Sequence, residues 1–269
     1  MGHIRLGKIP KSKKWSAVVE SVSKTGDTST LPADDLVANV QDVAKQTLIA
    51  AEGGLQTALN DTGLQYSFFL LTQIALAART NDWRQRLEQF GIYLSPDASF
   101  QDLTVEMQAA IDDFVFSHGR STDVGEIAQQ AACEAITDLT AQKAVTLFGS
   151  GAEELQIAVR DLSTKKGFST LGQKFFGVFM ARYLNFYLSR VTAANIGNKY
   201  LPQIGDINRF DDALRLHCEQ SARIVRDFCG EWFSKTEFKE GIDLDNTARF
   251  IAVAVKKLQA ELRQQGDEE

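Results

Sequence analysis

Apolar residues recur at intervals of three and four along almost the whole chain from Asp34 onward, which is the periodicity of an amphipathic α-helix. The four prolines all fall between the segments that carry this periodicity, where they do not interrupt a helix. The pattern therefore predicts an all-α protein, with helices at residues 13–23, 34–60, 64–79, 82–91, 100–117, 123–146, 151–163, 168–192, 207–233 and 243–264. Because glycine disfavours helix interiors, Gly53 and Gly54 predict a kink or break in the second of these helices.

The segment at about 168–192 is predicted to be the central helix. Its aromatic and methionine side chains wrap most of the helix circumference, at Phe168, Phe175, Phe176, Phe179, Met180, Tyr183, Phe186 and Tyr187. A helix that is apolar on most of its circumference is buried on several sides, whereas a surface helix carries one apolar stripe. Such a cluster can also line an apolar ligand pocket, but we favour core packing because no convergent polar groups accompany it.

Capping residues support several of the predicted helix starts. Pairs typical of N-caps or capping boxes precede the apolar runs, at Ser99 with Asp102, Asp123 with Glu126, Ser150 with Glu153, and at Asp206. At the opposite end of a helix, His118 precedes Gly119, where a histidine can satisfy the last carbonyl groups. These residues have structural interpretations and do not by themselves indicate a site.

Composition favours a single folded unit. The chain has 269 residues, of which 44% are apolar and 24% are charged, so it can bury a sizeable core. No shift in composition separates a second domain, and no repeat of fixed period is present. We therefore predict one multi-helix domain at residues 15–265, preceded by a basic extended arm at residues 1–14 and followed by an acidic tail at residues 266–269.

The N-terminal arm is the one segment that does not resemble core. Between Met1 and Trp15 it carries five basic residues and no acidic residue, at Arg5, Lys8, Lys11, Lys13 and Lys14. The remaining 254 residues carry 24 basic and 35 acidic residues, so charge is polarised along the chain. Such an arm is either a solvated tail or an electrostatic contact for nucleic acid or an acidic protein surface.

Candidate chemistry is sparse, and we predict no catalytic residue, metal site or cofactor. His217, Cys218 and Glu219 have the H-x-E order of zinc deaminases but lack the downstream P-C-x-x-C ligands. Cys218 and Cys229 are eleven residues apart, about 16 Å along a helix, which is too far for one metal ion. The odd number of cysteines, Cys133 included, suits reduced and packed thiols.

Other short motifs also have structural interpretations. The turn at residues 149–151 lacks the lysine of a P-loop, and no strand precedes it. Carboxylates that are adjacent in sequence, at Asp112 with Asp113 and at Asp211 with Asp212, point about 100° apart on a helix and do not form an acid/base pair. The series spaced by four at Arg215, Glu219, Arg223 and Asp227 is typical of a solvated salt-bridge ladder.

The sequence predicts a cytoplasmic protein without a membrane segment. No uninterrupted apolar stretch with a cleavage site follows the basic N-terminus, so a secretory signal is not expected. The longest apolar run, residues 68–78, is well short of the roughly 20 residues that span a bilayer.

Three segments together resemble a bacterial defence family. They are residues 1–7 (MGHIRLG), the block from Leu147-Phe148 through residues 175–179 (FFGVF), and residues 183–190 (YLNFYLSR). In these features the chain resembles the B component of the Qat anti-phage systems. The resemblance implies a non-enzymatic component that acts beside an ATPase, a nuclease and a QueC-like enzyme of deazaguanine chemistry. It also implies Gly2 as a site of N-terminal modification by that enzyme.

We therefore expect an accessory protein of a bacterial multi-protein system, with anti-phage defence as its setting, that works through protein contacts. Two alternatives remain open at this point. The first is a nucleic-acid-binding protein that uses the basic arm alone, and the second is a helical enzyme whose catalytic residues carry no local motif.

Overall fold

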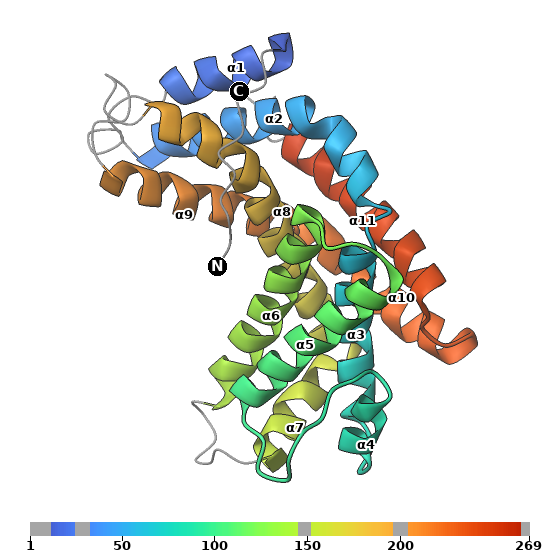
Figure 1. Ribbon diagram of the computed structural model, residues 1–269. Coiled ribbons are helices and arrows are strands. Elements are labelled where there is room, and N and C mark those ends of the chain that lie inside the picture. The colour runs from blue at the N-terminus through green and yellow to red at the C-terminus, as the bar shows by residue number, and fades with distance from the viewer. Residues whose placement is uncertain (1–11, 25–32, 145–151, 196–203, 265–269) are drawn as a thin grey trace.

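The computed structural model describes residues 12–24, 33–144, 152–195 and 204–264, and these form eleven α-helices without a strand (Figure 1). The all-α prediction is therefore confirmed. The helices are α1 (Lys13–Lys24), α2 (Ala33–Ala58), α3 (Thr62–Ala77), α4 (Trp83–Glu88), α5 (Phe100–His118), α6 (Asp123–Ala144), α7 (Ala152–Leu162), α8 (Lys165–Asn195), α9 (Ile204–Ser221), α10 (Arg223–Lys239) and α11 (Leu244–Gln264).

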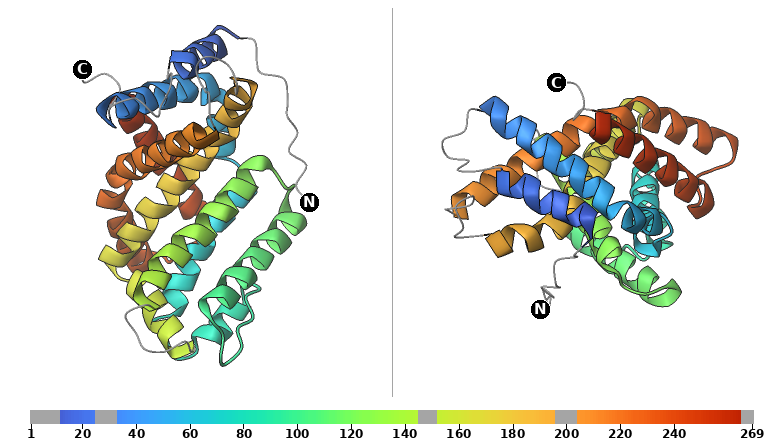
Figure 2. Two further views of the ribbon diagram at one scale, coloured as in Figure 1. Left: turned by 90° about the vertical axis from the view of Figure 1, so that its left-hand side faces the viewer. Right: turned by 90° about the horizontal axis from the view of Figure 1, so that it is seen from above.

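Helix α8 is the central element, as its aromatic residues predicted. It runs lengthwise through the molecule and contacts α1, α2, α6, α7, α9 and α10 (Figure 2). Its residues Phe168, Phe175, Phe176, Phe179 and Tyr183 are fully buried. A helix in contact with neighbours on most of its circumference needs apolar side chains on most of its circumference, which explains why α8 has no single apolar stripe.

An aromatic cluster joins α8 to α3, α10 and α11. At its centre, the Phe68 ring of α3 lies 5.1 Å from both Phe175 and Phe176, measured between ring centroids. The cluster continues through stacked pairs, at Phe168 with Phe233, at Phe68 with Phe250 and at Trp232 with Phe250. Most of these rings are fully buried, so the aromatic residues form the hydrophobic core, as we favoured over a ligand pocket.

Glycines allow α10 and α9 to approach α8 closely. Gly172 of α8 lies directly against the Cys229 side chain, and Gly230 of α10 lies directly against the carbonyl of Lys165 and the hydroxyl of Ser169. Five residues further along α8, Gly177 faces the backbone of α9. A side chain at these positions would separate the helices, because core packing leaves no room for an added methyl group.

The predicted helix at residues 207–233 is wrong as a single element, because α9 ends at Ser221 and α10 begins at Arg223. The Ser221 hydroxyl donates a hydrogen bond to the carbonyl oxygen of His217 at 2.9 Å. This contact of a serine with the preceding turn is one that bends helices. The break at Ala222 allows both α9 and α10 to pack along α8.

A break at the paired glycines of α2 does not occur, because α2 runs uninterrupted from Ala33 to Ala58. A Cβ on Gly54 would stand 2.7 Å from the hydroxyl oxygen of Tyr187 and 2.9 Å from that of Tyr183. Gly54 therefore provides room for the two tyrosines of α8. The packing of these tyrosines outweighs the cost of a glycine in a helix interior, which is about 1 kcal/mol relative to alanine.

The predicted helix caps are confirmed in part. Ser99 and Asp102 form a full capping box at α5. At α6 the cap is Thr122 rather than Asp123, because the Thr122 hydroxyl accepts a hydrogen bond from the Gly125 N–H at 2.9 Å. Threonine places its hydroxyl where it satisfies a free N–H of the first turn, and Asp123 then becomes the first helical residue.

Two further capping predictions have different outcomes. Asp206 lies inside α9, which begins two residues earlier at Ile204, so it is not the N-cap. Ser150 falls outside the described residues. At the end of α5, Nδ1 of His118 lies 3.0 Å from the carbonyl oxygen of Phe114, which confirms the predicted role of His118.

Helix α1 packs on α2 and on the C-terminal half of α8. The Trp15 ring stacks on Tyr187 with 5.4 Å between centroids, and Val18 and Val22 are buried. The Ser21 hydroxyl donates to Oδ2 of Asp42 on α2 at 2.7 Å. These contacts hold α1 on α2 and α8.

Replacing Gly230 by alanine tests the close packing of α10 on α8. The new methyl group would overlap the Lys165 carbonyl and the Ser169 hydroxyl, so we expect Gly230→Ala to lower the free energy of unfolding by about 2–3 kcal/mol. The matched control is Gly53→Ala in α2, where nothing lies within 4 Å of the new Cβ. Since alanine is the better helix former, the free energy of unfolding of this control, measured with urea, should rise by about 0.5–1 kcal/mol. A loss smaller than 0.5 kcal/mol in Gly230→Ala would contradict the packing described here.

Candidate functional site

The residues predicted to contact a partner lie at or before the start of α1. Gly2, Arg5, Lys8 and Lys11 fall outside the described residues. Lys13 and Lys14 form the exposed start of α1, whose first turn contains no acidic residue. The free N–H groups of a first helical turn carry partial positive charge, to which the two lysines add their own. This end of α1 is therefore electropositive.

The three cysteines are free and buried, as predicted. Burial raises the pKa of the Cys133 thiol to about 12, and it also raises the pKa values of Cys218 and Cys229. A thiol acts as a nucleophile or a metal ligand in its thiolate form, which burial disfavours. The described parts of the chain contain no group of three or more histidine, cysteine and acidic residues that could hold a metal ion.

The H-x-E order at residues 217–219 does not bring its members together. His217 is 5% exposed, and its Nε2 has no hydrogen-bond partner in the described structure. Burial lowers the pKa of His217 to about 4. Glu219 instead reaches α8, where its Oε1 accepts a hydrogen bond from Nζ of Lys174 at 2.9 Å. The sequence order is therefore coincidental, and His217 is a neutral core residue.

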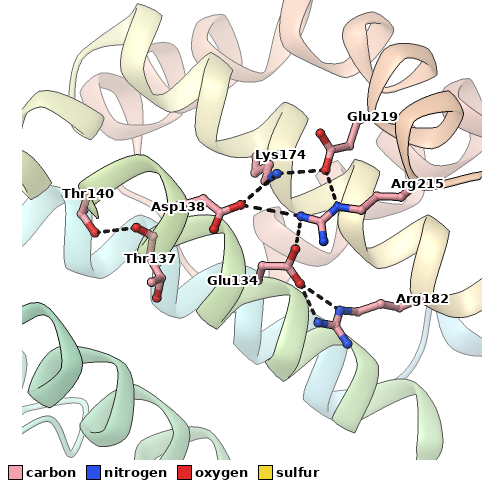
Figure 3. A network of polar contacts seen from close by, with 8 residues as sticks. All are labelled: Glu134, Thr137, Asp138, Thr140, Lys174, Arg182, Arg215 and Glu219. Atoms are coloured by element: carbon pink, nitrogen blue, oxygen red, sulfur yellow. Dashed lines mark hydrogen bonds and ion pairs between the residues drawn. The ribbon is translucent and has the colours of Figure 1, made fainter. Parts of the chain in front are cut away.

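A network of ion pairs links α6, α8 and α9, and we call it the charge network (Figure 3). Its members are Glu134, Asp138, Lys174, Arg182, Arg215 and Glu219. Glu134 of α6 stands between two arginines. Its Oε2 lies 2.6 Å from Arg182 of α8, and its Oε1 contacts Arg215 of α9. The Glu134 side chain is mostly buried, so these pairs are screened less than surface pairs.

The charge network corrects the predicted solvated ladder. Arg215 does pair with Glu219 at 3.1 Å, but both side chains are partly buried and contact neighbouring helices. Arg223 follows the break at Ala222 and therefore lies on α10 rather than α9. Sequence spacing within one helix could not reveal the partners on α6 and α8. These three acids and three bases neutralise one another, which suits helix packing rather than catalysis.

Lys174 is the partly buried cation of the charge network. Burial of its ammonium group lowers its pKa, but hydrogen bonds to Glu219 and Asp138 outweigh this effect and raise the pKa overall. Its Nζ lies 3.0 Å from Oδ2 of Asp138 on α6. Lys174 therefore stays charged and holds α6 and α9 together across α8.

A small pocket of about 210 Å³ adjoins the charge network and is lined by Arg182, Arg215, Asp211 and Asp212, among others. The adjacent aspartates line the same pocket, although neighbours on a helix point apart. Burial, and then the nearby Asp212 charge, raise the pKa of Asp211. The pocket is smaller than the 300–1,000 Å³ that is usual for small-molecule sites.

A groove between α5 and α6 has a volume of about 580 Å³. We call it the α5–α6 groove; its walls are residues 111–113, 115 and 116 of α5, the loop at 119–122 and the first turns of α6. Figure 2 shows α5 alongside α6 at the edge of the molecule. The lining combines the buried apolar residues Ile111 and Val115 with the exposed Phe116.

Three polar contacts hold the walls of the α5–α6 groove. Nε2 of Gln129 on α6 donates to the carbonyl oxygen of Gln108 at 3.0 Å and to Oδ1 of Asp112 at 2.7 Å. At the end of the groove, the Thr122 hydroxyl donates to Oδ2 of Asp61 at 2.5 Å, which ties the loop to the start of α3. The groove is therefore bounded by anchored helices and an anchored loop.

Phe116 is 90% exposed, although it belongs to an apolar run in α5. Its neighbour Phe114 stacks on Tyr66 of α3 with 3.7 Å between centroids, and Val115 is buried. Successive residues of a helix are rotated by about 100°, so three in a row cannot all face the body. The helical periodicity does not indicate Phe116 as exposed, although this run of three apolar residues is a signal that could have done so.

The α5–α6 hairpin is also strongly acidic. Residues 100–130 contain six acidic residues and one arginine, close to the whole net charge of −6 of the chain. Asp112, Asp113 and Glu126 line the groove together with Arg120. The groove is therefore an apolar hollow with an acidic rim.

The burial of His217 predicts a pH dependence of stability. Its pKa is about 4 in the folded protein and about 6.5 in an unfolded chain, so the unfolded state binds more protons between these values. The stabilising contribution of neutral His217 to the free energy of unfolding is therefore fully present above pH 6.5 and is lost as the pH falls toward 4. Between pH 7 and pH 4, we expect the free energy of unfolding, measured with urea, to fall by about 2–3 kcal/mol less in His217→Gln than in the wild type. Parallel curves for the two proteins would contradict a neutral buried His217.

No protein-family model, curated protein or solved structure matches the chain. Within the described ranges, no helix is both long enough and apolar enough to cross a membrane. Any inference about function therefore depends on the residues and contacts of this chain.

Proposed function

We propose that this protein is a non-enzymatic interaction component of a bacterial multi-protein system, with anti-phage defence as its setting, and that it binds a partner protein at the α5–α6 groove. The observation that carries the proposal is the 90% exposure of Phe116 beside a groove of about 580 Å³. Exposed aromatic residues next to a hollow are typical of protein-binding surfaces, where aromatic anchors supply much of the binding energy.

The chemistry of the groove favours a partner segment that is both apolar and basic. Burying the Phe116 ring contributes about 1.5–3 kcal/mol. Asp113 and Glu126 are exposed at the rim, where their charges attract a basic segment and disfavour an acidic one. A lysine- or arginine-containing helix or extended segment of another protein fits both properties.

The resemblance to the B component of the Qat systems suggests which proteins to test. An ATPase, a nuclease or a QueC-like enzyme encoded beside this protein would be the partner. Gly2 remains the proposed site of N-terminal modification by the QueC-like enzyme, and intact-mass measurement of the protein co-expressed with that enzyme would detect the added mass.

A second candidate function is nucleic-acid binding by the N-terminal arm. It is favoured by the exposed Lys13 and Lys14 at the electropositive start of α1, which continue the basic series of Arg5, Lys8 and Lys11. Phosphate contacts of this kind make binding strongly dependent on salt. Replacing Lys13 and Lys14 by glutamate would weaken such binding but would not change the α5–α6 groove.

Replacing Phe116 by alanine tests the proposed function. We expect Phe116→Ala to lower the affinity for a partner encoded beside this protein at least tenfold, because the aromatic anchor is lost. The charge variant Asp113→Lys/Glu126→Lys should have a similar effect and should also abolish protection against phage in cells that express the complete system.

The matched control is Phe238→Ala, because Phe238 of α10 is also 90% exposed but does not line the groove. This variant should bind and protect like the wild type. If Phe116→Ala and Phe238→Ala both retain full binding and full protection, the α5–α6 groove is not the partner site.

A further inference from the structure

We infer that the small pocket beside the charge network binds an organic cation, a guanidinium group on a short alkyl stem. We call it the α8–α9 pocket, after the two helices that supply most of its wall. Three observations carry the inference: unbalanced carboxylates in the wall, arginines whose hydrogen bonds are already made, and a size that suits the end of a chain. The inference does not rest on the proposed function, because this pocket and the α5–α6 groove have no lining residue in common.

The wall of the α8–α9 pocket carries two carboxylates, on the half-buried Asp211 and the exposed Asp212 of α9. Burial, and then the charge of Asp212, raise the pKa of Asp211, and within the described ranges no basic group offsets this rise. A half-buried carboxylate beside a second carboxylate is disfavoured in its charged form. A cation bound between them would stabilise both charges.

The two arginines of the wall are held by the charge network, so they do not form an anion site. Nε and Nη2 of Arg182 donate to Oε2 of Glu134, and Nη1 donates to Oε1 of Gln130 at 2.8 Å. Arg215 pairs with Glu134 and with Glu219 (Figure 3). Because the charge network contains three acids and three bases, the two aspartates give the pocket a net negative charge. This charge attracts a cation and repels an anion.

The acceptor groups of the wall suit a guanidinium group better than a metal ion or an ammonium group. Asp211, Asp212 and the amide of Asn185 on α8 can accept hydrogen bonds from a ligand. Calcium and magnesium ions need six or more oxygen ligands, more than two carboxylates and one amide supply without several waters. A guanidinium group has five N–H donors in one plane and binds carboxylates in pairs, whereas an ammonium group has three donors.

The volume and the apolar part of the wall suit a short alkyl stem. Val178 and Ala181 of α8 are buried and line the pocket between its polar groups. The volume of about 210 Å³ is below the 300–1,000 Å³ of sites for drug-sized molecules, so the pocket accommodates the end of a chain. An alkylguanidinium group of this size occurs in free small molecules and in the arginine side chain of a partner protein.

Binding of N-propylguanidine to the full chain tests the inference, with N-propylurea as the uncharged control of the same shape. At pH 7, we expect isothermal titration calorimetry to give a dissociation constant of about 1 mM or lower for N-propylguanidine. The affinity for N-propylurea should be at least tenfold lower, because it makes no charge-assisted hydrogen bond with the aspartates.

A blocked Gly-Arg-Gly peptide distinguishes the two sources of the guanidinium group. Its control is the same peptide with citrulline, the uncharged analogue, in place of arginine. If the arginine peptide binds more tightly than N-propylguanidine, the ligand is the side chain of a partner protein. If N-propylguanidine binds as tightly or more tightly, the ligand is a free small molecule. Either result supports a guanidinium site.

Replacing Asp211 by asparagine tests the role of its carboxylate. We expect Asp211→Asn to lower the affinity for N-propylguanidine at least tenfold. The variant should fold, because it removes a half-buried charge and keeps the size of the side chain. The matched control is Asp227→Asn, since Asp227 is exposed on α10 and does not line the pocket. This control should bind N-propylguanidine like the wild type.

Three results would overturn the inference. The first is equal affinity for N-propylguanidine and N-propylurea, and the second is equal affinity of the wild type and Asp211→Asn for N-propylguanidine. The third is no measurable binding of either N-propylguanidine or the arginine peptide. None of these experiments involves Phe116, so their failure would leave the partner-binding and phage results of Phe116→Ala intact, and the reverse also holds.

Discussion

The close packing of α10 and α9 against α8 is the contact on which the rest of the structure depends. Gly172 and Gly230 allow α10 to lie directly on α8, and this brings Phe233 and Trp232 into the aromatic cluster around Phe68. With α9 held at Gly177, Glu219 reaches Lys174, and the charge network then ties α6 to the same helix. Since α5 is attached to α6, the α5–α6 groove is ultimately positioned by the packing of α8.

The sequence predicted the part of the fold that depends on one helix at a time. The aromatic residues from Phe168 to Tyr187 identified α8 as central, because a helix buried on several sides must be apolar on several sides. Ser99 and His118 were predicted correctly because capping depends on residues a few positions away. Contacts between helices were not predictable in the same way. The continuity of α2 through Gly54 and the partners of Arg215 both depend on residues distant in the sequence.

The candidate site shows the same limit. The basic arm is visible in the sequence because its charge is local. The α5–α6 groove is not, because two helices and a loop are needed to form its walls. Phe116 was hidden in an apolar run that predicts burial, and only the neighbouring Phe114 and Val115 face the body. The molecule thus combines a basic N-terminal segment with an acidic hairpin that carries an exposed aromatic ring. The exposed ring beside the acidic groove is the feature from which we argue the proposed function.

The phenylalanines that build the core around α8 differ in burial from Phe116, the ring that we propose contacts a partner, and equilibrium unfolding tests this difference most directly. Phe179 is fully buried, whereas Phe116 is 90% exposed. Urea unfolding of Phe179→Ala should show a loss of about 3–5 kcal/mol, as for other buried aromatic residues. Phe116→Ala should stay within about 0.5 kcal/mol of the wild type. Similar losses for the two variants would contradict this assignment. If both losses were large, Phe116 would be a core residue, and if both were small, α8 would not be the buried centre of the fold.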